Sequence, residues 1–191
     1  MPPFRRVSEE EVFRAWLFTV DRFHLVDPND EPFERFVVRH PGAVTVVPLH
    51  DDGRVSLVRQ YRAAVDAMVL EIPAGTCDVV GESLEAAARR ELAEEAGLEA
   101  TTMEALIGTW NTPGISDQHT TIFLARGLTP CRSEPVGIEE RFMTVETVHL
   151  DDVDTLVADG TLKDETTVLG LYLARAHLAR VDSRHDQAPA S

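Results

Sequence analysis

The strongest chemical signal in the chain is a group of three glutamates close together in the sequence. Glu91, Glu94 and Glu95 stand at positions i, i+3 and i+4, so a helix would carry all three on one face. Like charges at this spacing destabilise a helix by roughly 0.2–0.5 kcal/mol per pair. A solvated acidic face is the usual reason for such a run. Carboxylates that converge can instead bind a hard cation such as Mg²⁺ or Mn²⁺, which prefers oxygen ligands.

The sequence around these glutamates favours the cation site. Ser83 is a good N-cap and Gly97 a natural C-terminal stop, so a helix is predicted over 84–96. Apolar residues recur every four positions on another face of this helix, where they can pack on a core. The preceding loop, residues 75–82, has glycines near both ends and can fold tightly against the helix. It would then add backbone oxygens and the carboxylate of Glu82 to the three helical carboxylates.

The stretch Gly75–Leu98, GTCDVVGESLEAAARRELAEEAGL, resembles the Nudix box. That pattern is Gly-x5-Glu-x7-Arg-Glu-U-x-Glu-Glu-x-Gly-U, where U is a bulky aliphatic residue. Every fixed position from Glu82 to Leu98 is met. Six residues separate Gly75 from Glu82 where the pattern has five. Because loops absorb length changes, this insertion leaves the helical positions in register.

The resemblance implies a metal centre. In this family the box glutamates bind divalent metal ions, and in its ADP-ribose branch a backbone carbonyl just before the box glycine is a further ligand. Other polar residues of the box orient the ligands through salt bridges. The expected ion is Mg²⁺, with Mn²⁺ as the alternative. Carried over to this sequence, the metal ligands are Ala74, Glu91, Glu94 and Glu95, and the orienting residues are Glu82 and Arg90.

Segments outside the box resemble the ADP-ribose pyrophosphatase branch of the family. Pro113 stands fifteen residues after the box, at the place of that branch's proline. Residues 58–62, VRQYR, and 71–75, EIPAG, are similar to its Gln-Tyr-Arg and Glu-Leu-Pro-Ala-Gly segments. The branch often has a glutamate shortly after the proline, where this chain has Gln118. The resemblance implies hydrolysis of ADP-ribose, or of a close nucleoside diphosphate derivative, to AMP and ribose 5-phosphate.

The remaining site residues follow from the same resemblance and from phosphate chemistry. In this branch the catalytic base is a glutamate on a loop before the last strand, where Glu139 and Glu140 are the candidates and Glu140 is favoured. Arginines are expected to hold the diphosphate, because a planar guanidinium matches phosphate oxygens. The expected substrate contacts are Arg62 first and Arg35 second, with Pro113, Gly114 and Gln118 in the proline loop.

Two other functions compete with this one. A Nudix hydrolase for a nucleotide sugar or NADH would carry the same box. A Nudix domain that senses ADP-ribose without cleaving it usually carries an added DNA-binding domain or has lost box glutamates. This chain keeps every box glutamate and has no basic segment, so the sensor is the weaker alternative.

Charge and cysteine content restrict the partners. The chain has 18 Lys and Arg against 33 Asp and Glu, a net charge of −15. Such a field repels nucleic acids and anionic membranes, so the expected partner is a small nucleotide. No apolar run approaches the length of a membrane span. The two cysteines form no CxxC pair, which is typical of reduced thiols in a cytoplasmic protein.

The elements that must position the site alternate between strands and helices. Short strands are predicted within 11–38 and at 68–72, 105–109, 120–125 and 143–148, and a hairpin joins 43–49 to 54–61 around Asp51-Asp52-Gly53. Further helices are predicted at 153–158 and 165–180. This mixture predicts an α/β fold, the Nudix α/β/α sandwich with a mixed sheet. The expected organisation is a small N-terminal β segment at 1–40 that forms a homodimer, a Nudix domain at 41–182 and a disordered tail at 183–191.

Overall fold

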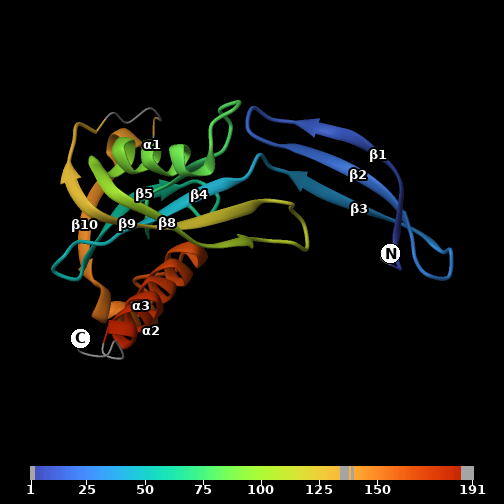
Figure 1. The fold of residues 1–191 in the computed structure, drawn as a ribbon. Coiled ribbons are helices and arrows are strands. Elements are labelled where there is room, and N and C mark those ends of the chain that lie inside the picture. The colour runs from blue at the N-terminus through green and yellow to red at the C-terminus, as the bar shows by residue number, and fades with distance from the viewer. Residues whose placement is uncertain (1–2, 134–137, 139, 186–191) are drawn as a thin grey trace.

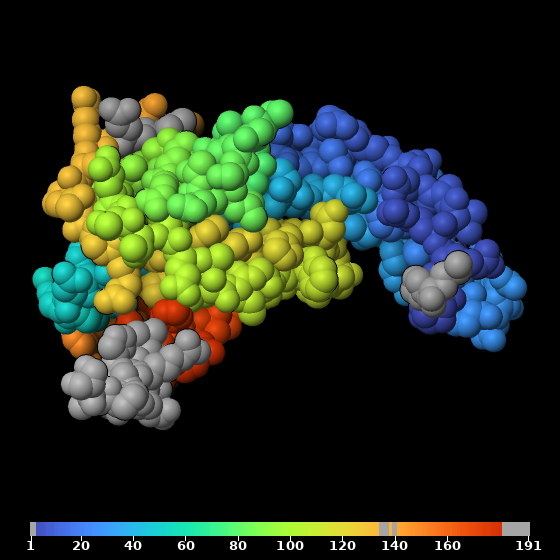
Figure 2. Space-filling model, in the orientation of Figure 1, coloured from blue at the N-terminus to red at the C-terminus, as the bar shows by residue number. Residues whose placement is uncertain are grey.

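The computed structural model describes residues 3–133, 138 and 140–185. Within these ranges the chain forms a three-stranded N-terminal sheet, two further sheets and three α-helices (Figure 1). The N-terminal sheet extends away from the rest of the molecule as an arm, while the other elements form one body (Figure 2). The α/β class and the preceding small β unit are therefore as the sequence predicts.

The arm is an antiparallel meander of β1 (Arg5–Arg14), β2 (Thr19–Val26) and β3 (Pro32–Arg39). The predicted strand region, which began at residue 11, missed most of β1, because every residue of this strand is exposed and its sequence lacks an apolar alternation. The strand predicted to begin at Ala15 was wrong at its start. Residues 15–18 form the turn between β1 and β2, closed by a hydrogen bond from the Ala15 amide to the Phe18 carbonyl (2.9 Å).

The strands of the body form two sheets, and the pairing of these strands differs from the predicted pairing. One has the order β7-β4-β9-β8 and is mixed, since β4 (Ala43–Pro48) runs parallel to β9 (His119–Pro130). The other is antiparallel with the order β10-β5-β6. The remaining strands are β5 (Arg54–Arg62), β6 (Ala67–Glu71), β7 (Ala74–Thr76), β8 (Leu98–Trp110) and β10 (Thr144–His149).

The predicted hairpin between the fourth and fifth strands was wrong, although its turn forms. Gly53 takes a positive φ of 83° at the turn. Beyond a single bridge between Leu49 and Val55, however, β4 and β5 separate into the two different sheets. The turn therefore carries the chain from one sheet to the other.

Helices cover both faces of the mixed sheet (Figure 1). On one face, Val44 and Val46 pack with Leu92 of α1 (Leu84–Ala96) in one buried cluster. On the other face, Val47 packs with Leu171 of α3 (Glu165–His185) in a second cluster. Alternate residues of the central strand thus point to opposite helices, which gives the predicted sandwich. The short α2 (Val153–Ala158) and the 3₁₀ turns η1 (Glu140–Phe142) and η2 (Leu150–Asp152) complete the body.

The two ends of α1 lie where the capping residues predict. The Ser83 side chain accepts a hydrogen bond from the Ala86 amide (3.2 Å), and Gly97 ends the helix in the left-handed conformation with φ 61°. Helix α3 continues to His185, three residues into the segment expected to be a tail, and residues 186–191 lie outside the described residues. None of the helices in the described part of the chain is both long and apolar enough to cross a membrane.

Candidate active site

Helix α1 holds two of its glutamates against the sheet. Glu91 and Glu95 are only 9% and 6% exposed, although their side chains are acidic. Strand β7 lies beside them, and Gly75 in that strand makes the approach possible. A Cβ atom added to Gly75 would stand 1.9 Å from the carboxyl carbon of Glu91 and 2.0 and 2.4 Å from its oxygens. The box glycine is therefore required by the position of a box carboxylate.

Arg90 links the box carboxylates to one another. Its Nε and Nη2 donate to Glu82 (3.1 and 3.0 Å), and its Nη1 donates to Glu91 (2.5 Å) and Glu94 (3.2 Å). This pairing lowers the pKa of Glu82, chiefly through the hydrogen bonds from Arg90. The same contacts raise the pKa of Arg90, so the guanidinium stays charged. Arg90 thus offsets part of the repulsion between carboxylates that the i, i+4 spacing creates.

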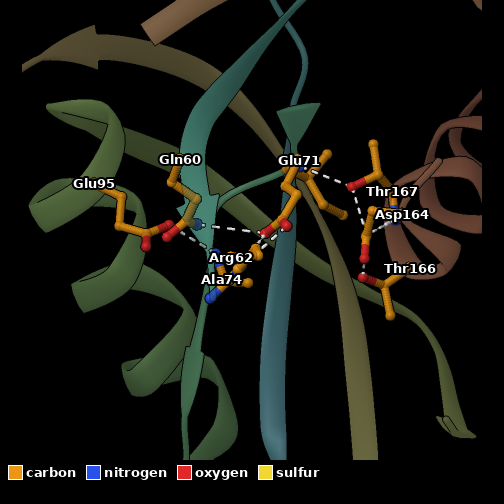
Figure 3. A network of polar contacts seen from close by, with 9 residues as sticks. Gln60, Arg62, Glu71, Ala74, Glu95, Asp164, Thr166 and Thr167 are labelled. Atoms are coloured by element: carbon orange, nitrogen blue, oxygen red, sulfur yellow. Dashed lines mark hydrogen bonds and ion pairs between the residues drawn. The ribbon is translucent and has the colours of Figure 1, made fainter. Parts of the chain in front are cut away.

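The backbone before the box glycine also belongs to this cluster. The Ala74 amide donates to Oε2 of Glu95 at 2.9 Å, which brings the Ala74 peptide against the helix (Figure 3). The one-residue insertion in the box does not disturb these contacts, because Gly75 reaches Glu91 and Glu82 reaches Arg90. The extra residue is accommodated in the loop between them.

The donor set fits a hard divalent cation. Three glutamates, Glu82, Glu91 and Glu94, surround the single guanidinium of Arg90, and Glu95 accepts from the Ala74 amide nearby, so the box carries an excess of negative charge. Among the described residues, no three acidic, histidine or cysteine side chains already converge in metal-binding geometry. The fit thus rests on the chemistry of the donors, which are carboxylate and backbone oxygens with two carboxylates largely withdrawn from water.

A cavity of about 1020 Å³ opens beside this cluster. Ala74 and Gly75 line it, and its wall also includes Arg62 and Gln118, two of the expected substrate contacts. The turn between β5 and β6 and the start of β6 supply apolar wall residues such as Val65 and Met68. A cavity of this volume, apolar in part and with a few polar groups, is suited to a small-molecule ligand.

Arg62 is held in place by a buried carboxylate. Its Nε and Nη2 donate to both oxygens of Glu71, with the shortest contact at 2.5 Å. Glu71 is 5% exposed and also accepts from the Gln60 side chain at 3.4 Å (Figure 3). Although burial lowers the pKa of Arg62, the contacts with Glu71 outweigh it and the pKa is raised. Nη1 makes no hydrogen bond within the described part of the chain, so this group remains available to a ligand.

The wall opposite α1 is built by the start of α3. The Asp164 carboxylate accepts from the Thr166 hydroxyl and from both the amide and the hydroxyl of Thr167, each at 2.7 Å. Thr167 in turn accepts from the Ile72 amide at 3.0 Å, which ties α3 to the end of β6. Figure 3 shows Glu95 and Asp164 on opposite sides of the view, with Arg62 between them.

Comparison with known proteins agrees with this geometry. A family model for the NUDIX domain matches residues 39–168. The chain belongs to the Nudix hydrolase family. An ADP-ribose pyrophosphatase of Mycobacterium tuberculosis is 32% identical over 173 residues, which cover 91% of this chain and 84% of that protein. A Bacillus subtilis protein of the same name is 30% identical over 167 residues, 87% of this chain and 90% of its own.

A solved structure extends the likeness to three dimensions. A crystal structure of an ADP compounds hydrolase matches this Nudix hydrolase with a TM-score of 0.80 at 27% identity. The match covers 94% of this chain and 96% of the other, so it includes the arm as well as the body. The likeness therefore concerns the whole arrangement of the described elements.

The loop between β8 and β9, which carries the other expected substrate contacts, is attached to the end of the arm. The Val38 amide donates to the Ile115 carbonyl (2.8 Å), and Arg39 forms an ion pair with Asp117 (2.7 Å). The His40 amide also donates to Asp117 (2.9 Å). Gln118 reaches the cavity wall, whereas Pro113 and Gly114 lie in the loop outside the cavity lining.

Arg35, a predicted substrate contact, is not among the described residues that line the cavity. Arg35 lies on β3 in the arm, where its guanidinium stacks on the Phe33 ring at 4.8 Å and donates to the Glu34 carbonyl. Glu139 lies outside the described residues. The backbone of Glu140 begins the 3₁₀ turn η1, directly before β10.

The sequence interpretation missed several residues of the site. Glu71 and Gln60 stood in segments noted for their resemblance, but no role was assigned to either. Asp164 and Lys163 also line or border the cavity and carried no local signal. Asp164 and Lys163 lie far from the box in the sequence, so only the folded structure places them beside the same cavity.

Proposed function

We propose that this Nudix hydrolase cleaves the diphosphate of ADP-ribose, or of a close nucleoside diphosphate derivative, to AMP and ribose 5-phosphate. The observation that carries the proposal is a large cavity lined by the guanidinium of Arg62 and by Ala74 and Gly75, which lie directly against the box glutamates Glu95 and Glu91. The names of the two relatives support ADP-ribose as the substrate.

The chemistry is the addition of water to one phosphorus atom and the breaking of its bond to the bridging oxygen. In the proposal, Ala74, Glu91, Glu94 and Glu95 hold divalent metal, Mg²⁺ first and Mn²⁺ as the alternative. Such ions, when bound, neutralise phosphate charge and make water more acidic. Arg90 and Glu82 keep the glutamates in position through the ion pairs described above.

The other residues of the proposal bind substrate and accept the proton. Nη1 of Arg62 donates to a phosphate oxygen, while Glu71 fixes the orientation of the guanidinium. Gln118 donates to or accepts from a ribose hydroxyl through its neutral amide. Glu140 takes the proton of the attacking water, with Glu139 as the alternative. Pro113 and Gly114 shape the loop that presents Gln118.

A substrate panel with Mg²⁺ tests the proposal. ADP-ribose should release AMP at a kcat/KM at least tenfold above GDP-mannose and NADH, and chelator should abolish turnover. Glu95→Gln should leave a folded protein whose activity is lower by orders of magnitude. The substrate assignment fails if another compound on the panel is preferred, and a near-normal rate in Glu95→Gln would overturn the metal assignment.

We also propose that two chains associate through the arm. Its three strands are too few to enclose a core, and an isolated small sheet is marginal in water. Apolar side chains on the arm are correspondingly exposed: Val7 is 64% exposed, Phe13 55% and Phe36 57%. In a homodimer the arm would cover these groups and bring Arg35 towards the cavity of the partner. A fully active monomer at micromolar concentration in sedimentation experiments would argue against this assembly.

The cellular location is a further part of the proposal. Cys77 and Cys131 are both unpaired thiols. Burial raises the pKa of Cys77 and of Cys131, so neither thiol is activated for exchange. These properties support a reducing compartment, the cytoplasm.

A further inference from the structure

The chain has one lysine among its 18 basic residues, and that lysine lines the cavity. Lys163 lies in the turn between α2 and α3 and lines the cavity beside Asp164, which Figure 3 shows on the side opposite Glu95 of α1. Every other basic side chain of this acidic protein is an arginine, so the position of the single ammonium group can be tested chemically as well as by mutation.

Lys163 differs from the arginines of the same cavity in its ion pairs. Arg62 is paired with Glu71, and Arg59 is paired with Glu146 through contacts of 2.5 and 3.1 Å. For Lys163 no salt bridge is found in the described part of the chain. It is therefore the cationic side chain of the cavity wall whose charge is least compensated by a neighbouring carboxylate.

The backbone around Lys163 is fixed on both sides. Leu162 is 3% exposed, and its amide donates to the Leu156 carbonyl at 2.9 Å. On the other side, Asp164 caps the start of α3 through the threonine contacts described above. Gly160 has a φ of +78°, and a Cβ there would stand 3.2 Å from Cε of Lys163, so the lysine stem lies over a residue without a side chain. These contacts hold the backbone on both sides of Lys163, from which its four-carbon stem carries the ammonium group.

We propose that Lys163 is a substrate-binding residue whose ammonium group contacts a phosphate oxygen of the nucleoside diphosphate, from the wall opposite the box helix. The inference deepens the proposed function and rests on it. A chain with a net charge of −15 repels an anionic substrate, so cations must reverse the field locally. The box cluster does so where metal binds, and Lys163 does so on the other wall. A mobile point charge suits this role, because it can follow the phosphate as the ligand settles.

Kinetics of matched variants provide the first test. Lys163→Ala should raise KM for ADP-ribose about tenfold or more, because a hydrogen bond from a charged group is lost, while kcat changes less than threefold. Lys163→Arg should recover most of the affinity, and the KM of Lys163→Ala should depend less on salt. Arg126→Ala is the control: it removes one positive charge from an exposed residue of β9 that does not line the cavity, and it should leave KM unchanged.

Chemical labelling provides the second test and does not require turnover. An amine reagent can modify one side chain in this protein, and mass spectrometry separates its peptide from the N-terminal amine. AMP, ribose 5-phosphate or ADP with Mg²⁺ should slow labelling of Lys163, and the more protective product identifies the half of the substrate it contacts.

The two tests separate failure of this inference from failure of the proposed function. If the protein hydrolyses ADP-ribose but Lys163→Ala keeps its KM within twofold and no ligand protects the lysine, Lys163 does not bind substrate. If ADP-ribose is not hydrolysed, the proposed function fails, and protection by ADP still decides whether Lys163 contacts a diphosphate. A KM increase of the same size in Arg126→Ala would also overturn the inference, because it would assign the effect to overall charge.

Discussion

Replacing Gly75 with alanine should separate activity from stability. The new Cβ would lie 1.9 Å from the carboxyl carbon of Glu91. Carbon atoms that are not bonded pack at about 3.5–4.0 Å, so the carboxyl group must withdraw by more than about 1.5 Å. The Glu91 side chain is flexible, but the residue is only 9% exposed, and its Oε1 accepts a hydrogen bond from Arg90 at 2.5 Å. The substitution therefore moves a box carboxylate away from its place.

The two consequences differ in size. Crowding of this kind destabilises a protein by typically 1–3 kcal/mol, and the value here should lie near the lower end, about 1 kcal/mol, because the displaced atoms end a side chain. A misplacement of about 1 Å at a reacting centre can cost about 100-fold in rate. Gly75→Ala should thus lose about 100-fold in kcat/KM, while denaturant unfolding shows a folded protein.

Release of AMP from ADP-ribose and unfolding in urea measure the two quantities. Gly127→Ala is a control for the loss of stability, because its Cβ would stand 2.7 Å from Oγ1 of Thr101 at a φ of +64°, and neither residue nor its sequence neighbours line the cavity. It should keep normal activity at a similar cost in stability. If Gly75→Ala retains kcat/KM within threefold of the parent protein, the position of Glu91 beside Gly75 does not matter for catalysis.

Two further predictions concern the base and the diphosphate contact. Glu140→Gln should reduce kcat strongly and leave KM nearly intact, because the interaction of the base develops in the transition state. An inactive Glu139→Gln beside an active Glu140→Gln would assign the base to Glu139. Two active variants would refute a base in this loop. Arg62→Ala should raise KM and also lower the free energy of unfolding by about 1–3 kcal/mol, because it leaves the buried Glu71 carboxylate without its ion pair. Adding Glu71→Gln to Arg62→Ala should restore the stability measured in urea but not the KM, and equal recovery of both would show that Arg62 acts only through folding.

Helix α1 was predictable because its signals are local. Ser83 and Gly97 define its ends through their own backbone and side-chain properties, and the glutamate spacing needs only the period of a helix. The contacts of Arg90 with Glu82 and Glu94 likewise link residues eight and four positions apart. A motif confined to one helix and its preceding loop therefore carries most of its own geometry.

The strand pairing was not predictable in the same way. The Asp-Gly turn before Arg54 is compatible with a hairpin, but β4 gains more partners from β9, which lies some seventy residues further along the chain. Strand β8 begins directly after α1, yet its first half has no apolar alternation that would distinguish it from a loop. Tertiary context, which a single sequence does not display, decided both cases.

Some functional residues of the cavity wall could not be identified from the sequence for the same reason. Lys163 has no distinctive neighbours in the sequence, and Glu71 stood in a recognised segment without an assigned role. Each becomes a candidate only in the folded chain, where both line the cavity. Arg35 illustrates the converse, because its residue type suggested a phosphate contact while its strand lies in the arm. Residue type identified what these side chains could do, and topology determined where they could do it.

The attachment of the β8–β9 loop to the arm affects how an engineered monomer would behave. Deleting residues up to about 40 would remove the arm, but it would also remove Val38, Arg39 and His40, which bind Ile115 and Asp117. Gln118 follows directly on this loop and reaches the cavity. A truncated enzyme that loses activity would therefore not report on subunit association alone. Point substitutions on the exposed face of the arm, such as Phe13→Ser, would leave these tethers intact and test association separately.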